Sequence, residues 1–165
     1  MRPWPIILVL LSSLQAAACT HRHGSGAPRA ASTLDSLVGI VSIAGTSFEQ
    51  HIVLRSRNST TTLEFSKSDS AALSRVGGTE VVVYGNSSAD MFRVVNFEVV
   101  RVEGAPVLDG VLAQLGEKLV LETAAGRVLL GNPPTAFRGM LGARIWVGGP
   151  LDTGPNIYGI IVPTP

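Results

Sequence analysis

Cysteine is nearly absent from this chain, and charged and aromatic side chains are scarce. The single cysteine, Cys19, lies near the N-terminus, which excludes a cysteine nucleophile from the rest of the chain. Aromatic residues make up 5% of the sequence, few for a protein that stacks bases on a row of rings. Hydrophobic residues reach 45%, too many for a disordered chain, and 18 glycines and 10 prolines favour short strands joined by tight turns.

The net charge of +1 hides an uneven distribution along the chain. Three of the 13 basic residues precede Asp35, whereas all 12 acidic residues lie from Asp35 onward. From Asp35 onward the chain therefore has ten basic and twelve acidic residues, which gives a net charge of −2. Because polyanions are bound by clustered Lys and Arg, this balance disfavours nucleic acid as a partner.

The first eighteen residues have the order of a secretory signal peptide. Arg2 is followed by an apolar stretch from Trp4 to Leu14 and then by the small residues Ala16, Ala17 and Ala18. The apolar stretch would rise only ~16 Å as a helix, too short for a hydrocarbon core of ~30 Å. We expect residues 1–18 to be removed after export, with cleavage after Ala18.

The tetrapeptide Ala16-Ala17-Ala18-Cys19 resembles the lipobox of bacterial lipoproteins. This resemblance covers the first nineteen residues and implies that Cys19 is lipidated and becomes the first residue of the mature protein. Position −3, where Leu is commonest in the family, is Ala16 here, so ordinary cleavage and secretion without a lipid is the alternative, and an uncleaved anchor a further one. An unpaired thiol is a liability in an oxidising compartment, which favours lipidation.

The lipobox resemblance also carries an expected location. Thr20, rather than aspartate, follows the cysteine, as in outer-membrane lipoproteins of enteric-type bacteria. We therefore expect a lipid-anchored protein of the cell envelope, on the periplasmic face of the outer membrane in a Gram-negative host. Residues 20–33 lack apolar periodicity, so 19–33 are predicted to be the lipidated cysteine and a flexible tether. A metal site at Cys19, His21 and His23 is disfavoured because a lipidated sulfur is no longer a thiolate.

The rest of the chain contains a weak internal repeat of about 60–70 residues. Gly39 matches Gly110, Ile52-Val53-Leu54 matches Leu119-Val120-Leu121, and the run from Gly78 to Gly85 matches that from Gly142 to Gly149. Each copy predicts five strands from apolar, β-branched runs that alternate with polar residues and end at turn residues. The expected ranges are 37–44, 50–56, 61–66, 79–85 and 91–102, then 107–114, 118–123, 127–131, 143–149 and 157–162.

One short helix is expected in each copy, between the third and fourth strands. Residues 68–76 begin with capping residues and end at Gly77-Gly78, and the equivalent segment begins at Pro133-Pro134. A matched apolar pair, Leu73 and Val76 in one copy and Phe137 and Met140 in the other, would plug one end of a barrel.

This order resembles that of the OB-fold, a small five-stranded barrel. The resemblance implies an all-β protein with tandem OB-like lobes at 34–103 and 104–165. SH3-like barrels or a single β-sandwich are the alternatives.

Groups able to carry catalysis are few in the two lobes. His51 is the single histidine after the tether, and it is expected at a strand surface. The acidic residues, Asp109 and Asp152 among them, lie on different predicted elements and are expected to be solvated. We therefore predict no catalytic residues, no cofactor and no metal site; an enzyme built around His51 is the least favoured alternative.

The expected function is that of a non-enzymatic binding or scaffold module on a membrane, with an envelope protein as a possible partner. An OB-type protein that binds oligosaccharide or single-stranded nucleic acid is the alternative. Its ligand would contact the loops 45–49, 86–90, 115–117 and 150–156. The aromatic candidates near those loops are Phe48, Tyr84, Phe92, Trp146 and Tyr158.

Overall fold

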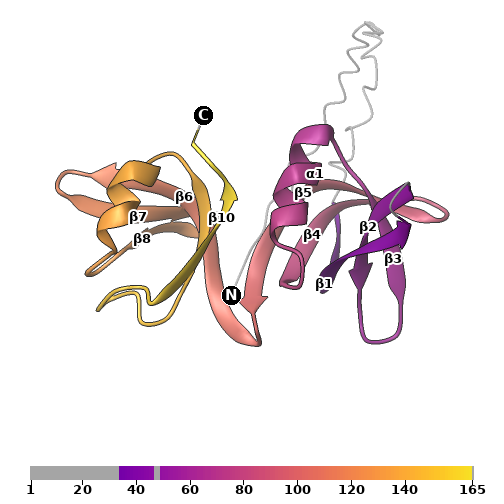
Figure 1. Cartoon of the computed structure of the whole chain (residues 1–165), viewed down its shortest axis with the longest axis horizontal. Helices are drawn as coiled ribbons and strands as arrows, with labels where there is room; N and C mark the ends of the chain where they lie inside the picture. Colours follow the sequence, from indigo (N-terminus) through magenta and orange to yellow (C-terminus); the bar gives the residue numbers. More distant parts are fainter. Residues whose placement is uncertain (1–33, 47–48, 165) are drawn as a thin grey trace, which may run out of the picture. The chain divides into compact units, whose positions relative to one another are not determined.

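The computed structural model describes residues 34–46 and 49–164, which form ten strands and two short helices (Figure 1). The predicted all-β class is confirmed. The elements are β1 (Asp35–Thr46), β2 (Glu49–Arg55), β3 (Thr60–Glu64), α1 (Lys67–Arg75), β4 (Glu80–Ser87), β5 (Met91–Val102), β6 (Ala105–Leu115), β7 (Lys118–Thr123), β8 (Gly126–Leu129), the 3₁₀ helix η1 (Thr135–Met140), β9 (Arg144–Gly148) and β10 (Ile157–Val162). The expected signal peptide, Cys19 and the tether lie outside the described residues.

The predicted strand ends agree with the observed ones to within two residues. β5, β7 and β10 have the bounds expected from the sequence. This agreement arises because β-branched and apolar runs end at residues that favour turns, such as glycine, asparagine and proline. Strand position was therefore readable from local pattern alone.

The strands of the first half pair in a closed ring. β1 lies antiparallel to both β2 and β4, and β2 lies antiparallel to β3. β3 pairs with β5 in parallel from Thr62 to Glu64, and β5 pairs with β4 in antiparallel. The order β1–β2–β3–β5–β4 thus returns to β1, and these strands leave no long unpaired edge.

The second half repeats this order but closes differently. β6 pairs with β7 and β9, β7 with β8, and β9 with β10, all antiparallel. Among the described residues no ladder joins β8 to β10. β10 has six residues where β5 has twelve, and the chain before it is the loop 149–156. A hydrogen bond from the Gly131 N–H to the Leu151 carbonyl, 2.7 Å, joins the segment after β8 to this loop.

Positions that the sequence comparison matched make the same backbone hydrogen bonds in both halves. In each half the glycine two residues before the strand that follows the helix donates a bond to the first strand, and the residue after that glycine accepts one from the same strand. The bonds are Val41 N–H to Thr79 O (3.1 Å) and Gly78 N–H to Val41 O (2.9 Å), then Leu112 N–H to Ala143 O (2.9 Å) and Gly142 N–H to Leu112 O (2.8 Å). The repeat inferred from sequence therefore extends to local geometry.

Each half has its own group of buried apolar side chains. The first is built on β1–β5 and α1, and the second on β6, β7, β9 and η1. The expected plug residues Leu73, Val76 and Phe137 are at most 1% exposed, and Met140 is half-buried. Leu73 and Val76 are held by a helix capped at Ser66, whose hydroxyl accepts the Asp69 N–H at 3.4 Å.

We expect a methyl group at Gly110 to destabilise the fold, since a Cβ there would lie 2.5 Å from the Glu122 carbonyl oxygen. The matched Gly39 has the same constraint, with the Arg55 carbonyl oxygen at 2.6 Å. Gly39→Ala and Gly110→Ala should each lower the free energy of unfolding by about 1–3 kcal/mol, measured by urea denaturation.

The control is Gly139→Ala in η1, where a Cβ meets no atom within 4 Å. This variant should stay within about 0.5 kcal/mol of the parent or be slightly more stable, because alanine restricts the unfolded chain. Equal effects at Gly110 and Gly139 would contradict the close strand approach.

Candidate functional site

The residues predicted from the sequence for lipidation and signal-peptide cleavage are not among those that the structure describes. Cys19, Ala18, His21 and His23 all lie outside the described residues. His51 lies on β2 and is exposed, opposite Ala44 of β1. Within residues 34–46 and 49–164, no three His, Cys, Asp or Glu side chains are grouped to hold a metal ion. The helices of this part of the chain are also too short or too polar to cross a bilayer.

The aromatic side chains predicted to lie near a ligand differ in how far they are buried. Phe92 is buried, Tyr84 and Trp146 are half-buried, Tyr158 is 38% exposed, and Phe48 lies outside the described residues. Trp146 covers the glycine opposite it, Gly159, where a Cβ would meet the indole ring at 2.5 Å. Tyr158 meets the ring of Phe137 edge-on, with 4.9 Å between centroids. In the described part of the chain, Tyr158 is therefore the one aromatic candidate that is substantially exposed.

A buried ion pair, Asp109 with Arg144, lies where the two halves meet. The expectation that Asp109 is solvated was wrong, because its side chain is 5% exposed. Its Oδ1 accepts a hydrogen bond from Arg144 Nε at 2.8 Å, and its Oδ2 accepts one from Arg144 Nη2 at 2.7 Å. Such a two-point contact fixes both the distance and the plane of the guanidinium.

The same two side chains bind the backbone of β5 in the first half. Asp109 Oδ2 accepts the Val99 N–H at 2.9 Å, and Arg144 Nη2 donates to the Phe97 carbonyl. The guanidinium also lies over the Phe97 ring, 4.4 Å from its centroid. The Phe97 C=O and Val99 N–H are two residues apart in the strand, so they point to the same edge. The ion pair thus supplies the acceptor and donor that a neighbouring strand would.

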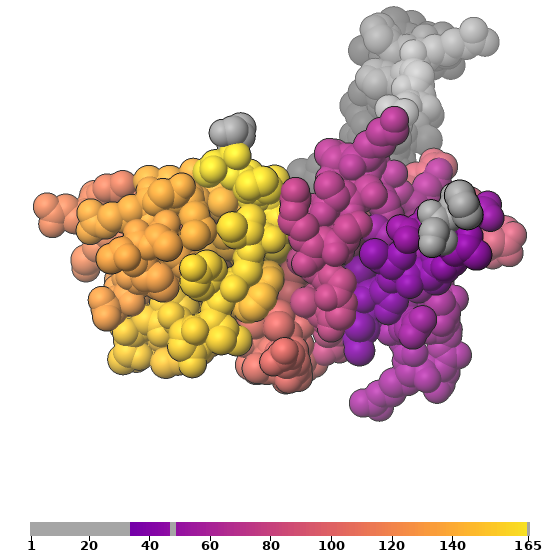
Figure 2. All heavy atoms as spheres, in the orientation of Figure 1, coloured from indigo at the N-terminus to yellow at the C-terminus, as the bar shows by residue number. Residues whose placement is uncertain are grey.

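Further contacts join the halves around this pair. Val107 and Ile161, from β6 and β10, belong to the buried group of the first half, and Trp146 packs against it. Arg75 of α1 donates to the Ile161 carbonyl at 3.3 Å. Figure 2 shows the yellow C-terminal segment in contact with the magenta part of the first half. The chain passes between the halves through a turn with positive φ at Glu103 (50°) and Gly104 (81°). Residues 33–165 accordingly form one compact unit.

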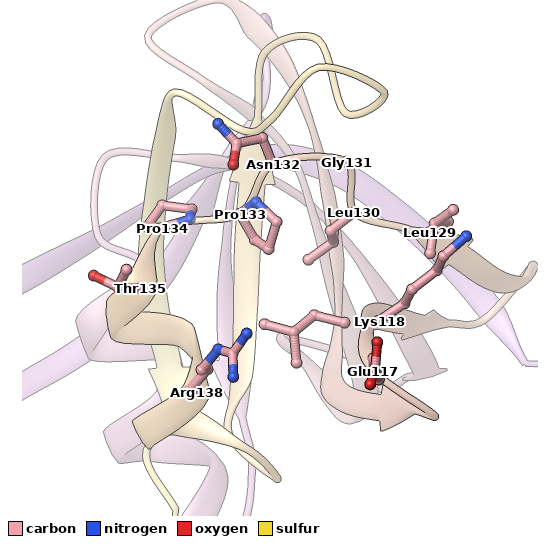
Figure 3. A pocket seen from close by; sticks show the side chains of 11 residues that line it. Glu117, Lys118, Leu129, Leu130, Gly131, Asn132, Pro133, Pro134, Thr135 and Arg138 are labelled. Carbon is pink, nitrogen blue, oxygen red and sulfur yellow. The ribbon is translucent and has the colours of Figure 1, made fainter.

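A pocket of 460 Å³ lies in the second half between the strands and η1 (Figure 3). Its walls are the start of β7, the end of β8, the segment 131–135 and Arg138. Leu119 and Leu130, 7% and 2% exposed, provide its apolar floor. Figure 3 shows Arg138 extending from η1 on one side, while Lys118 and Glu117 lie on the other. We refer to this cavity as the η1 pocket.

The η1 pocket lies where the second half differs from the first. In the first half the chain after β3 enters α1 at once, and nine residues of helix follow. In the second half Pro133 and Pro134 lack N–H groups and hold the chain extended, so a shorter 3₁₀ helix of six residues begins at Thr135. Gly131 lies so close to the β9–β10 loop that a Cβ would be 1.9 Å from the Asp152 carbonyl oxygen.

A second hollow, of 510 Å³, lies on the outer face of the first half. It is bounded by the exposed side chains of Val38 and Ile40 and by Arg55 and Arg57. Its floor is the surface of a strand, whereas the η1 pocket reaches buried leucines. We therefore take the η1 pocket as the better candidate for a ligand site. This pocket was not predicted from the sequence. The signal that was available was the Pro133-Pro134 pair, which was interpreted only as the start of the helical segment.

Comparison with known proteins adds no assignment. No protein-family description matches the chain, and no curated protein matches it.

We expect Asp109→Ala to lower the free energy of unfolding by about 3 kcal/mol, because it leaves a half-buried guanidinium and the Val99 N–H without their acceptor. The matched control is Glu122→Ala, which removes an exposed carboxylate paired with Arg127 at 2.8 Å and should cost less than about 1 kcal/mol. Chemical denaturation measures both. Equal losses in the two variants would show that the junction pair contributes no more than a surface contact.

Proposed function

We propose that this chain is an envelope lipoprotein, anchored to a membrane through Cys19, that presents two OB-like lobes as a non-enzymatic binding or scaffold module. The observation that carries the proposal is the junction of the two halves. The packing of Val107 and Ile161 into the buried group of the first half, the ion pair of buried Asp109 with half-buried Arg144, and a two-residue turn join the two lobes into one body. Such a body has the stiffness that a presented binding surface needs.

The N-terminal sequence supports the anchor. Ala16-Ala17-Ala18-Cys19 follows an apolar stretch, and the chain has no other cysteine. If the cysteine carries three acyl chains, each buried CH₂ contributes ~0.8 kcal/mol, which makes the attachment effectively permanent. The fourteen residues 20–33 then separate the lipid from β1 by a mean distance of roughly 20 Å if they form a random coil.

The OB-like assignment is supported by strand order. A ring in the order first, second, third, fifth and fourth strand, with a helix between the third and fourth, is the arrangement of that fold. The first half has this ring, and the second half has the same order with a loop in place of the third-to-fifth strand ladder. SH3-like lobes and a single sandwich account less well for a helix at this position in both halves.

Oligosaccharide binding, the alternative function, is favoured by one specific observation. The η1 pocket has an apolar floor of Leu119 and Leu130 and a polar rim, which suits a compact ligand. A net charge of −2 after residue 34 and the buried or half-buried state of most aromatic candidates favour this ligand class over single-stranded nucleic acid.

The anchor is tested by the Cys19→Ala variant expressed in a bacterial host. The parent should sediment with membranes and have a mass increased by its acyl chains, whereas the variant should be in the supernatant with unchanged thermal unfolding. Cleavage after Ala18 leaves Cys19 first under both lipidation and plain secretion, so only the mass of that residue separates them. A free thiol on the parent, or membrane retention of the variant, would refute the anchor.

A further inference from the structure

We propose that the η1 pocket binds an acidic sugar unit, with its carboxylate held by Arg138 and its ring lying on the aliphatic floor. The proposal deepens the proposed function, because it names the ligand class of a binding module. It does not depend on the lipid anchor, since the residues of the pocket belong to the second half alone.

The pocket has a shape that the fold already maintains without a ligand. Pro133 and Pro134 have fixed φ angles, and the Phe137 N–H donates to the Pro134 carbonyl at 3.0 Å. The Gly131 N–H donates to the Leu151 carbonyl, which ties the opposite end of this segment to the β9–β10 loop. A ligand would therefore meet walls that need little ordering, and this lowers the entropic cost of binding.

The charges at the rim favour an anion. The rim has two basic side chains, Arg138 and Lys118, and one acidic side chain, Glu117, and among the described residues neither basic side chain forms an ion pair. Arg138 lies on the η1 side, where its guanidinium can bind a carboxylate with two hydrogen bonds. Glu117 lies across the pocket beside Lys118, so a negative charge on the ligand is directed toward Arg138.

The remaining polar groups fit hydroxyls. Glu117, Asn132 and Thr135 place a carboxylate, an amide and a hydroxyl around the opening. Together they offer both donors and acceptors, as a polyol requires. The floor of Leu119 and Leu130 and the wall of Pro133 and Pro134 provide apolar contact for the C–H face of a ring. A fatty acid would satisfy the floor and Arg138 but would make no use of these three groups.

Binding is measured by NMR titration of the full chain carrying Cys19→Ala, with galacturonate, galactose and a tripeptide with a free C-terminus as probes at concentrations up to about 10 mM. Galacturonate should shift the amide signals of residues 117–119, 129–132 and 135–138 and leave those of the first half unchanged. Arg138→Gln should weaken galacturonate binding about tenfold, the loss expected for a charge-assisted hydrogen bond, and bring it close to that of galactose. The matched control is Arg57→Gln, which changes an exposed arginine of the first half and should bind like the parent.

Thr135→Trp is a second variant that fills the opening from an exposed position and should abolish the shifts. Failure of galacturonate to shift these residues would overturn the proposal, as would equal binding by Arg138→Gln and Arg57→Gln. Stronger binding of the tripeptide than of galacturonate would also overturn it, in favour of a peptide carboxylate. These outcomes are separate from the test of the anchor, because the titrated protein already lacks Cys19.

Discussion

The contact between Asp109, Arg144 and the backbone of β5 is the constraint on which the arrangement of the two halves depends. Removing two opposite charges from water costs several kcal/mol per ion, and the pair is stable only because its hydrogen-bonding groups are used. Asp109 accepts from Arg144 and from the Val99 N–H, and Arg144 donates to the Phe97 carbonyl. A register shift between β4 and β5 places a β-bulge next to Val99. Without the ion pair, the Val99 N–H and the Phe97 carbonyl at this edge of β5 would need water or another chain as partners.

The two halves share their local structure but differ in how their strands close and in the surface that results. Both halves have a matched glycine within the first strand, the same hydrogen bonds between the helix-to-strand segment and the first strand, and a matched apolar pair at the helix. They differ where the third strand would meet the fifth. A twelve-residue β5 closes the first ring, whereas a loop bonded through Gly131 replaces that ladder in the second and leaves room beside η1. The candidate ligand site therefore depends on a structural difference between the two halves.

These two features fit the proposed role of a tethered module. A body that is anchored by one end of its chain presents its surfaces in a fixed relation only if its lobes do not move independently. The shared core around Val107 and Ile161 and the turn at Glu103 and Gly104 provide that stiffness. The η1 pocket lies in the second lobe, so the whole first lobe separates it from the tether in the sequence.

The sequence by itself determined the all-β class, the positions of the strands and of both helical segments, and the matched plug residues. Each of these follows from periodicity and turn chemistry within a few neighbouring residues, which a single sequence displays. Only the tertiary structure decided that Asp109 is buried, that Trp146 covers Gly159, and that the second ring lacks its closing ladder. The reason is physical: the partners of Asp109 and Arg144 lie up to 47 residues away in the chain. Whether a charge is solvated or paired depends on which distant backbone the fold brings against it, and no local pattern contains that information.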